Sequence, residues 1–101
     1  IFSKATAAYA KFGFGGEWKL HHQGGPTGYT GRDYRGMLGC SNKLLENQAV
    51  AWNPSITGTK SEDTCLVLKN KTEIISQSPS WPMLKVKAGA STLLRPDILI
   101  K

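Results

Sequence analysis

The fold class is decided by the stretch Ala49-Val50-Ala51-Trp52, a short apolar run that ends at Asn53-Pro54. Three further segments have similar character: residues 65–68 (Cys-Leu-Val-Leu), residues 72–75, and residues 84–87, where leucine and valine alternate with lysine. Short apolar runs bounded by Asn, Pro, Gly and Ser are typical of strands. Strict alternation of apolar and polar residues predicts a half-buried strand with one solvent-exposed face. Many short strands of this kind predict a barrel or a sandwich. We expect Trp52 to lie in the core, because its strand is apolar throughout.

Helical signals are few. Residues 41–48 and residues 96–101 are the expected short helices, the second because Pro96 suits a first helical turn. Residues 4–10 contain alanines that suit a helix, but Thr6, Tyr9 and the flanking glycines allow a strand equally well. The sequence therefore predicts one all-β domain over residues 1–101, with helix confined to one or two short segments.

The charge balance is basic, with 13 Lys and Arg against 7 Asp and Glu and a net charge of +6. Such a field favours acidic surfaces and polyanions such as nucleic acid, anionic lipid or a pectin-like polysaccharide. The basic residues are scattered, which argues against a dedicated nucleic-acid arm. No apolar run approaches the roughly 20 residues that a membrane-spanning helix needs. We expect a monomer that does not insert into a membrane.

The two cysteines, Cys40 and Cys65, belong to no CxxC pair and to no Cys/His cluster with zinc-ligand spacing. A disulfide is favoured over two free thiols, and it would contribute about 3 kcal/mol on the chain-entropy model. A disulfide implies an oxidising compartment, and the sequon at Asn70-Lys71-Thr72 is consistent with secretion. No cofactor is expected, because the glycines at 13–16 lack the spacing of a phosphate loop.

Residues 13–39 are rich in glycine, with aromatic and polar residues between the glycines. A loop of this length in a small domain is typically functional or mobile. Flat aromatic side chains beside polar groups suit the apolar faces of sugar rings and also protein hot spots; burial in the core is the alternative. The candidate carbohydrate-binding face consists of Trp18, Tyr29, Arg32, Asp33, Tyr34 and Arg35.

The adjacent His21 and His22 are the only histidines. One of them could act as a general acid or base in a nuclease, with Arg32 or Arg35 stabilising charge. Neighbouring residues of an extended segment point to opposite faces, so at most one histidine is expected in a single site. The alternative is a pair of exposed loop histidines without a catalytic role.

The chain from Cys40 onward resembles the double-psi β-barrel proteins of the barwin, expansin and plant-natriuretic-peptide-like group. The matching segments are a glycine-flanked cysteine, a strand of the Val-Ala-Leu/Trp-Asn type and a second cysteine that opens a strand, here residues 39–42, 48–53 and 65–68. Residues 4–9 are similar to the first strand of that family, and residues 74–79 and 92–99 are similar to its C-terminal motifs. The resemblance implies a six-stranded barrel, a Cys40–Cys65 disulfide and a secreted, defence-type or cell-wall-associated protein.

Three positions depart from the pattern of that group. Ser76 and Leu93 stand where the family has aspartates, and Ser78 stands where it has a cysteine. Glycosidases use a pair of carboxylates as acid and base, and these substitutions remove them. The sequence therefore predicts carbohydrate binding without catalysis. The alternatives are an inhibitor of papain-like cysteine proteases, with Ser80-Trp81-Pro82 or the glycine-rich loop as a wedge, and a barwin-like ribonuclease.

Overall fold

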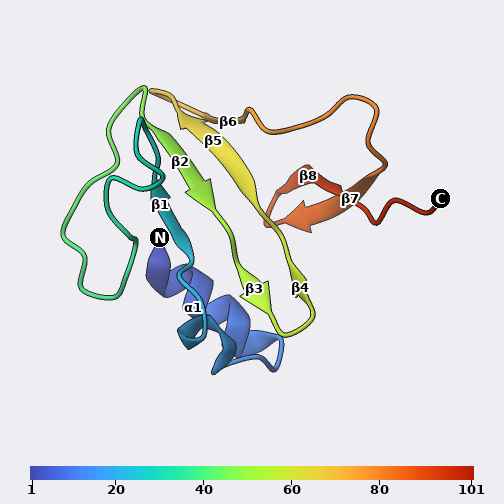
Figure 1. The fold of residues 1–101 in the computed structure, drawn as a ribbon, viewed down its shortest axis with the longest axis horizontal. Helices are drawn as coiled ribbons and strands as arrows, with labels where there is room; N and C mark the ends of the chain where they lie inside the picture. Colours follow the sequence, from blue (N-terminus) through green and yellow to red (C-terminus); the bar gives the residue numbers. More distant parts are fainter.

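The computed structural model describes all 101 residues, and strands dominate it, as expected for a small all-β protein (Figure 1). The helical elements are α1 (Phe2–Lys11) and the 3-10 helix η1 (Glu17–Lys19). The strands are β1 (Gly24–Pro26), β2 (Ala49–Trp52), β3 (Ser55–Ile56), β4 (Thr59–Lys60), β5 (Asp63–Val67), β6 (Thr72–Ile74), β7 (Met83–Ala88) and β8 (Ser91–Pro96).

The central sheet has four antiparallel strands in the order β1-β2-β5-β6. Strand β2 is the apolar run from Ala49 to Trp52, and it lies between β1 and β5, with Val50 opposite Pro26 on one side and Cys65 on the other. The strands predicted near residues 49–52, 65–68 and 72–75 are confirmed. They were recognisable because each carries apolar side chains that this sheet covers at least in part.

The sheets do not close into a barrel. The central sheet ends at β1 and β6, while β3 pairs only with β4 and β7 pairs only with β8. The expected closed six-stranded barrel is therefore wrong for this structure. The physical reason is that the two edge strands of the central sheet have three residues each and that the long C-terminal strands bond to each other instead of extending that sheet.

The β7–β8 hairpin stands apart from the central sheet (Figure 1). Its alternating pattern correctly predicted a strand, but the expected half-burial is wrong: Leu84 and Val86 are 47% and 43% exposed. One charged side chain joins the hairpin to the central sheet. Arg95 of β8 pairs with the buried carboxylate of Asp63 in β5, and Ser76 Oγ donates to Asp63 Oδ1 at 2.8 Å.

The N-terminal segment is helical, so its assignment to a first β-strand by family resemblance is wrong. Alanine has the highest helix propensity, and the alanines of α1 favour the helix that the sequence left open. Tyr9 is the one buried residue of α1, and its hydroxyl lies 2.7 Å from Gln23 Oε1 and 2.8 Å from the Ser55 carbonyl. The helices expected at residues 41–48 and 96–101 do not form; Pro96 ends strand β8, and the other residues are in turns and irregular backbone.

Part of the glycine-rich segment forms strand β1, where a loop was expected. A Cβ on Gly24 would lie 2.2 Å from the Ala51 carbonyl oxygen, and a Cβ on Gly25 would lie 2.2 Å from that of Tyr34. Only glycine permits these close approaches. The two glycines thus let β2 and the backbone around Tyr34 pack against opposite sides of one short strand.

The core is small: nine residues are buried, and the apolar side chains among them are those of Tyr9, Pro26, Val50 and Ala51. Trp52 is half-buried, so its expected place in the core is wrong. The buried polar side chains are Gln23, Asn53 and Asp63. Polar contacts between elements therefore have a large share in holding this fold together.

Cys40 and Cys65 are free thiols, and the predicted disulfide is wrong. Cys40 is exposed and lines a cavity with Phe2 and Met37, whereas Cys65 is half-buried in β5 and lines a different cavity with Ile74. The two side chains are thus directed into separate cavities. No helix in the structure combines the length and apolar character that crossing a membrane requires.

Candidate functional site

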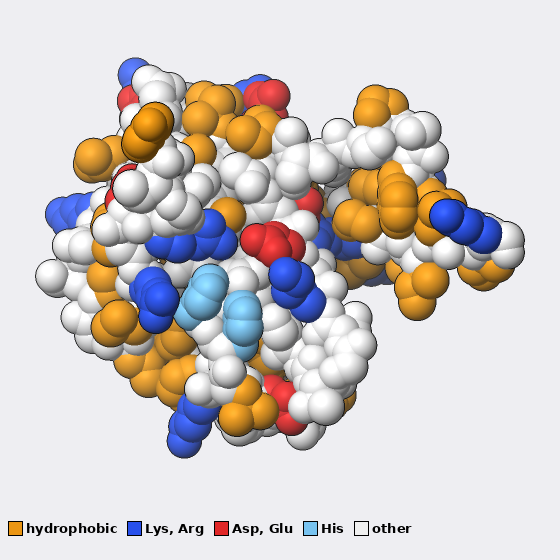
Figure 2. Space-filling view, viewed as in Figure 1, with side chains coloured by type: hydrophobic (Ala, Val, Ile, Leu, Met, Phe, Trp, Pro, Cys, Tyr) orange, Lys and Arg blue, Asp and Glu red, His pale blue; other side chains and the backbone are white.

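A polar, open cleft of about 570 Å³ lies where three separate parts of the chain meet. The turn after η1, the segment around residues 31–35 and the region of β2 to β4 each contribute to its walls. Figure 2 shows the two histidines side by side on this face, with basic side chains around them and an acidic group next to them. The lining residues are His21, His22, Gly31, Arg32, Tyr34, Arg35, Asn53, Lys60 and Glu62.

His21 and His22 stack on each other, with ring centroids 4.5 Å apart and planes inclined by 25°. The expectation that they point to opposite faces is wrong, because the backbone is not extended here: Leu20 has helical dihedral angles and His21 lies in a bend. His21 Nδ1 lies 2.5 Å from the His22 carbonyl oxygen. Since a carbonyl only accepts, this contact places the proton of neutral His21 on Nδ1 and leaves Nε2 as an acceptor.

Buried Gln23 fixes the backbone that carries the histidines. Its Nε2 donates to the carbonyl oxygens of Trp18 and His21 at 3.2 and 2.7 Å, while its Oε1 accepts from the Tyr9 hydroxyl. A side chain that is only 1% exposed and bonded at both ends has little freedom to move. Helix α1, through Tyr9, thus positions one wall of the cleft.

The opposite wall is held by ionic contacts. Glu62 Oε2 lies 2.9 Å from Lys60 Nζ, and Glu62 Oε1 lies 3.6 Å from Arg32 Nη2. The hydrogen bond from Lys60 lowers the pKa of Glu62, and the charges of Lys60, Arg32 and His22 act in the same direction, whereas burial opposes them. Glu62 is therefore a carboxylate at neutral pH.

The surroundings of His22 favour its neutral form. Desolvation in the cleft lowers the pKa of His22, and the neighbouring charges of His21, Arg35 and Arg32 lower it further, against the opposing effect of Glu62. At neutral pH the cleft thus carries three fixed positive charges, on Arg32, Arg35 and Lys60, and the single negative charge of Glu62. Its net charge is positive.

Two buried polar atoms in the cleft walls have no protein partner. They are Nε of Arg32, a donor, and Oδ1 of Asn53, an acceptor. Asn53 is 3% exposed, and its Nδ2 lies 3.5 Å from His21 Nδ1. A buried polar group without a hydrogen bond costs about 1–3 kcal/mol, so a group that supplied the missing partners would be bound favourably.

A second, more apolar cavity adjoins the cleft. Trp18 lies in it, half-buried, with its ring edge-to-face against Phe2 at a centroid distance of 5.7 Å and an interplanar angle of 84°. His21, His22 and Arg35 line both this cavity and the cleft. The two hollows therefore form one continuous surface with an aromatic end and a charged end.

The structure brings together some of the predicted site residues and separates others. Arg32, Tyr34 and Arg35 line the cleft, and Trp18 lies in the adjoining cavity. Tyr29 is fully exposed and lines neither hollow.

Asp33 also lies outside the cleft. Its side chain turns to the neighbouring loop, where Oδ1 lies 3.5 Å from Thr30 Oγ1. The predicted six-residue face is thus divided, with four of its members around the two hollows and two in the loop.

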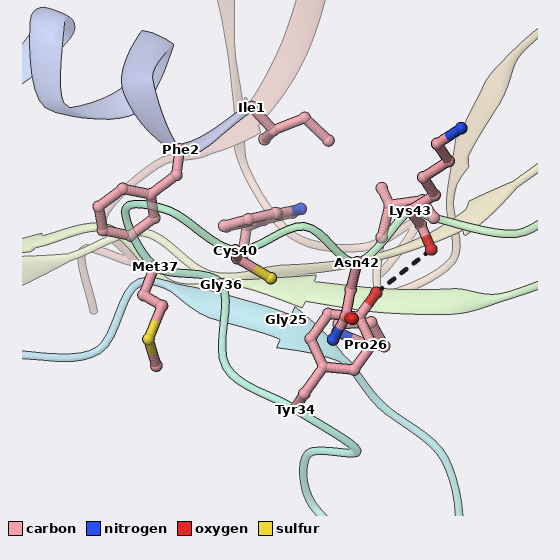
Figure 3. Close-up of a pocket in the computed structure, with 12 residues that line it drawn as sticks. Ile1, Phe2, Gly25, Pro26, Tyr34, Gly36, Met37, Cys40, Asn42 and Lys43 are labelled. Atoms are coloured by element: carbon pink, nitrogen blue, oxygen red, sulfur yellow. Dashed lines mark hydrogen bonds between the residues drawn. The ribbon is translucent and has the colours of Figure 1, made fainter.

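Tyr34 separates the cleft from a third cavity, shown in Figure 3. Its hydroxyl donates to the Lys43 carbonyl at 3.4 Å, and the side chains of Phe2, Met37 and Cys40 lie around the same space. Tyr34 thus has a structural contact on one side and faces the cleft on the other.

Sequence reasoning missed three residues of the cleft: Asn53, Lys60 and Glu62. Asn53 was recognised only as the end of a strand, and the other two lie on and after β4. A turn at Thr57-Gly58 joins β3 to β4, and Gly58 has a positive φ of 92°. A two-residue loop that contains glycine is typical of a hairpin, so the sequence could have predicted the β3–β4 hairpin. It could not have predicted that this hairpin lines the cleft.

The β3–β4 turn is tied to η1. Glu17 Oε2 accepts hydrogen bonds from the backbone N–H and the hydroxyl of Thr57, at 2.9 and 3.0 Å. These contacts hold the hairpin that carries Lys60 against the segment that carries the histidines. Glu17 therefore has a structural role in joining η1 to the hairpin.

The predicted glycosylation asparagine, Asn70, is exposed between β5 and β6. No group of three or more His, Cys, Asp or Glu side chains is arranged to hold a metal ion. Comparison of the chain with protein-family models, with curated proteins and with solved structures finds no match.

Proposed function

We propose that this protein binds carbohydrate without catalysing a reaction, at the surface formed by the cleft and the adjoining Trp18 cavity. One observation carries the proposal: His21, His22 and Arg35 line both hollows, so that an aromatic ring and a dense set of polar groups lie on one continuous surface. Ligand sites of this size typically combine apolar area with a few polar groups that fix orientation.

The two ends of this surface suit the two sides of a sugar. The half-buried ring of Trp18 offers apolar area for the C–H face of a pyranose, and its contact with Phe2 fixes the ring's orientation. The cleft supplies donors on Arg32, Arg35 and Lys60 and an acceptor on Glu62 for ring hydroxyls. The proposal needs no catalytic step.

An extracellular, cell-wall-associated or defence role is part of the proposal, and the exposed sequon at Asn70 is its support. The free cysteines remove the support that a disulfide would have given. The resemblance to the barwin and expansin group stays a prediction from sequence motifs, and the binding site proposed here does not depend on it.

The test is retention on polysaccharides, measured by affinity electrophoresis with chitin, cellulose, neutral galactan and polygalacturonate. Wild type is expected to bind at least one of them, and Trp18→Ala to bind it at least about tenfold more weakly. The matched control is Trp81→Ala, because Trp81 is an exposed tryptophan that precedes the distant β7–β8 hairpin. Equal loss in both variants would contradict the placement of the site.

Three other outcomes would contradict the proposal itself. Wild-type protein that binds none of the polysaccharides refutes it. Nanomolar inhibition of papain without retention on polysaccharide would favour a protease inhibitor. Hydrolysis of RNA that is lost in His21→Ala would favour a nuclease, for which the stacked histidines beside Arg32 and Arg35 supply the chemistry.

A further inference from the structure

We propose that the cleft recognises the carboxylate of an acidic sugar, so that the polysaccharide bound at the proposed carbohydrate site is a polyuronate. The inference rests on the proposed function and adds the class of ligand. Its starting point is the composition of the cleft walls, in which cations, a carboxylate and unpartnered polar atoms occur together.

The cationic side chains of the cleft favour a ligand with an anionic group. Arg32, Arg35 and Lys60 surround the cleft, and the single carboxylate of Glu62 already contacts Arg32 and Lys60. Arg35 is exposed and makes no hydrogen bond or ion pair within the chain. Guanidinium groups bind carboxylates with two parallel hydrogen bonds, which makes Arg35 the free anchor for an acid group.

The unpartnered buried atoms call for a ligand that both donates and accepts. Arg32 Nε needs an acceptor, and Asn53 Oδ1 needs a donor. A hydroxylated sugar acid provides both, since its carboxylate accepts and its hydroxyls donate. Both atoms belong to residues that line the cleft, as do the exposed side chains of His21, His22 and Arg35.

Glu62 favours a uronate chain over a phosphate polymer as the ligand. The pKa of Glu62 is lowered by Lys60 and Arg32, so the group remains a carboxylate in the cleft. It would repel closely spaced phosphodiesters, whereas a sugar hydroxyl can donate to it. A chain with one negative charge per ring and several hydroxyls fits this mixture better than a nucleic-acid backbone does.

The histidines make binding sensitive to pH. Desolvation lowers the pKa of His22 most, the charges of His21, Arg35 and Arg32 lower it further, and Glu62 opposes them. These four side chains are the charged or titratable groups that face His22. A bound carboxylate stabilises the protonated form, so the pKa of His22 rises on binding and a proton is taken up. Affinity is therefore expected to increase as pH falls from neutrality toward the lowered pKa of the free protein.

The experiment compares polygalacturonate with its fully methyl-esterified form, which keeps the backbone and removes the charge. Binding is measured by affinity electrophoresis and calorimetry at pH 7.5 and pH 5.5. We expect the acid form to bind at least about tenfold more tightly than the ester. Arg35→Gln should lose about tenfold in affinity for the acid form alone, and Lys87→Gln, an exposed lysine of the β7–β8 hairpin, should lose none.

The outcomes separate the two proposals. Equal binding of acid and ester overturns the uronate assignment and leaves the carbohydrate site intact, whereas binding of neither, nor of any neutral polysaccharide, overturns both. Tighter binding of inorganic polyphosphate or RNA than of polygalacturonate assigns the cleft to phosphate instead. An affinity that does not rise at pH 5.5, or that rises equally in His22→Gln, overturns the part given to His22.

Discussion

Replacement of Tyr9 by phenylalanine tests whether one hydroxyl joins helix α1 to the sheet and to the cleft. The hydroxyl lies 2.7 Å from Gln23 Oε1 and 2.8 Å from the Ser55 carbonyl, and it accepts from the Ser55 N–H at 2.7 Å. The substitution removes one oxygen and keeps the ring. It therefore changes these polar contacts while leaving the apolar packing of a residue that is 8% exposed.

The expected loss follows from the groups left behind. Gln23 Oε1 and the Ser55 N–H would both lose a partner in buried or half-buried surroundings, at about 1–3 kcal/mol each. The free energy of unfolding should thus fall by about 2–6 kcal/mol. For a domain of this size, a loss of 2 kcal/mol lowers Tm by about 10 °C.

The assay is urea and thermal denaturation followed by circular dichroism. The control is Tyr29→Phe, which removes a fully exposed hydroxyl and should change the free energy of unfolding by less than about 0.5 kcal/mol. Equal stability of wild type and Tyr9→Phe would refute the reasoning. So would equal loss in both variants, because the effect would then not depend on burial.

Two further predictions concern the thiols and the hairpin. With Ellman's reagent at pH 8, exposed Cys40 should react at once and Cys65 much more slowly, since burial raises the pKa of Cys65 and lowers its thiolate fraction; a protein without reactive thiols would contradict the free cysteines. Arg95→Ala should lower the free energy of unfolding by roughly 2 kcal/mol, because it leaves the buried carboxylate in β5 without its cation. Lys85→Ala on the same hairpin is the control, and equal stability of the two variants would show that the pair does not anchor the hairpin.

The sequence predicted four strands that carry apolar side chains, β2, β5, β6 and β7, but it missed β8, although that strand contains Leu93 and Leu94. The run from Ala49 to Trp52 was recognisable because hydrophobic side chains mark a strand on a core. Strands β1 and β4 consist of Gly-Gly-Pro and Thr-Lys, whose composition is that of loops, and only their pairing with neighbours makes them strands. The sequence of residues 4–10 does not distinguish a helix from a strand, because alanine and Tyr9 fit either structure.

Tertiary contacts explain the errors in the site and in the disulfide. Arg32, Tyr34 and Arg35 were predicted because they are close together in sequence, and the turn after η1 adds the histidines from nearby. Lys60 and Glu62 are far from the histidines in sequence and reach the cleft only through tertiary folding. No local sequence pattern could therefore predict that they line it. The number of cysteines likewise does not show where their side chains point, and the two thiols line different cavities.

The turn at Thr57-Gly58 gives the cleft a simple route to new specificity. Residues inserted there would lengthen the β3–β4 hairpin, which shares no strand with the central sheet. Exposed turns tolerate insertions well, because few buried contacts are disturbed. A longer turn would release the Glu17 contact and shift Lys60 relative to the histidines. Related proteins could therefore diverge in what they bind through the length of a single turn while the four-stranded sheet remained unchanged.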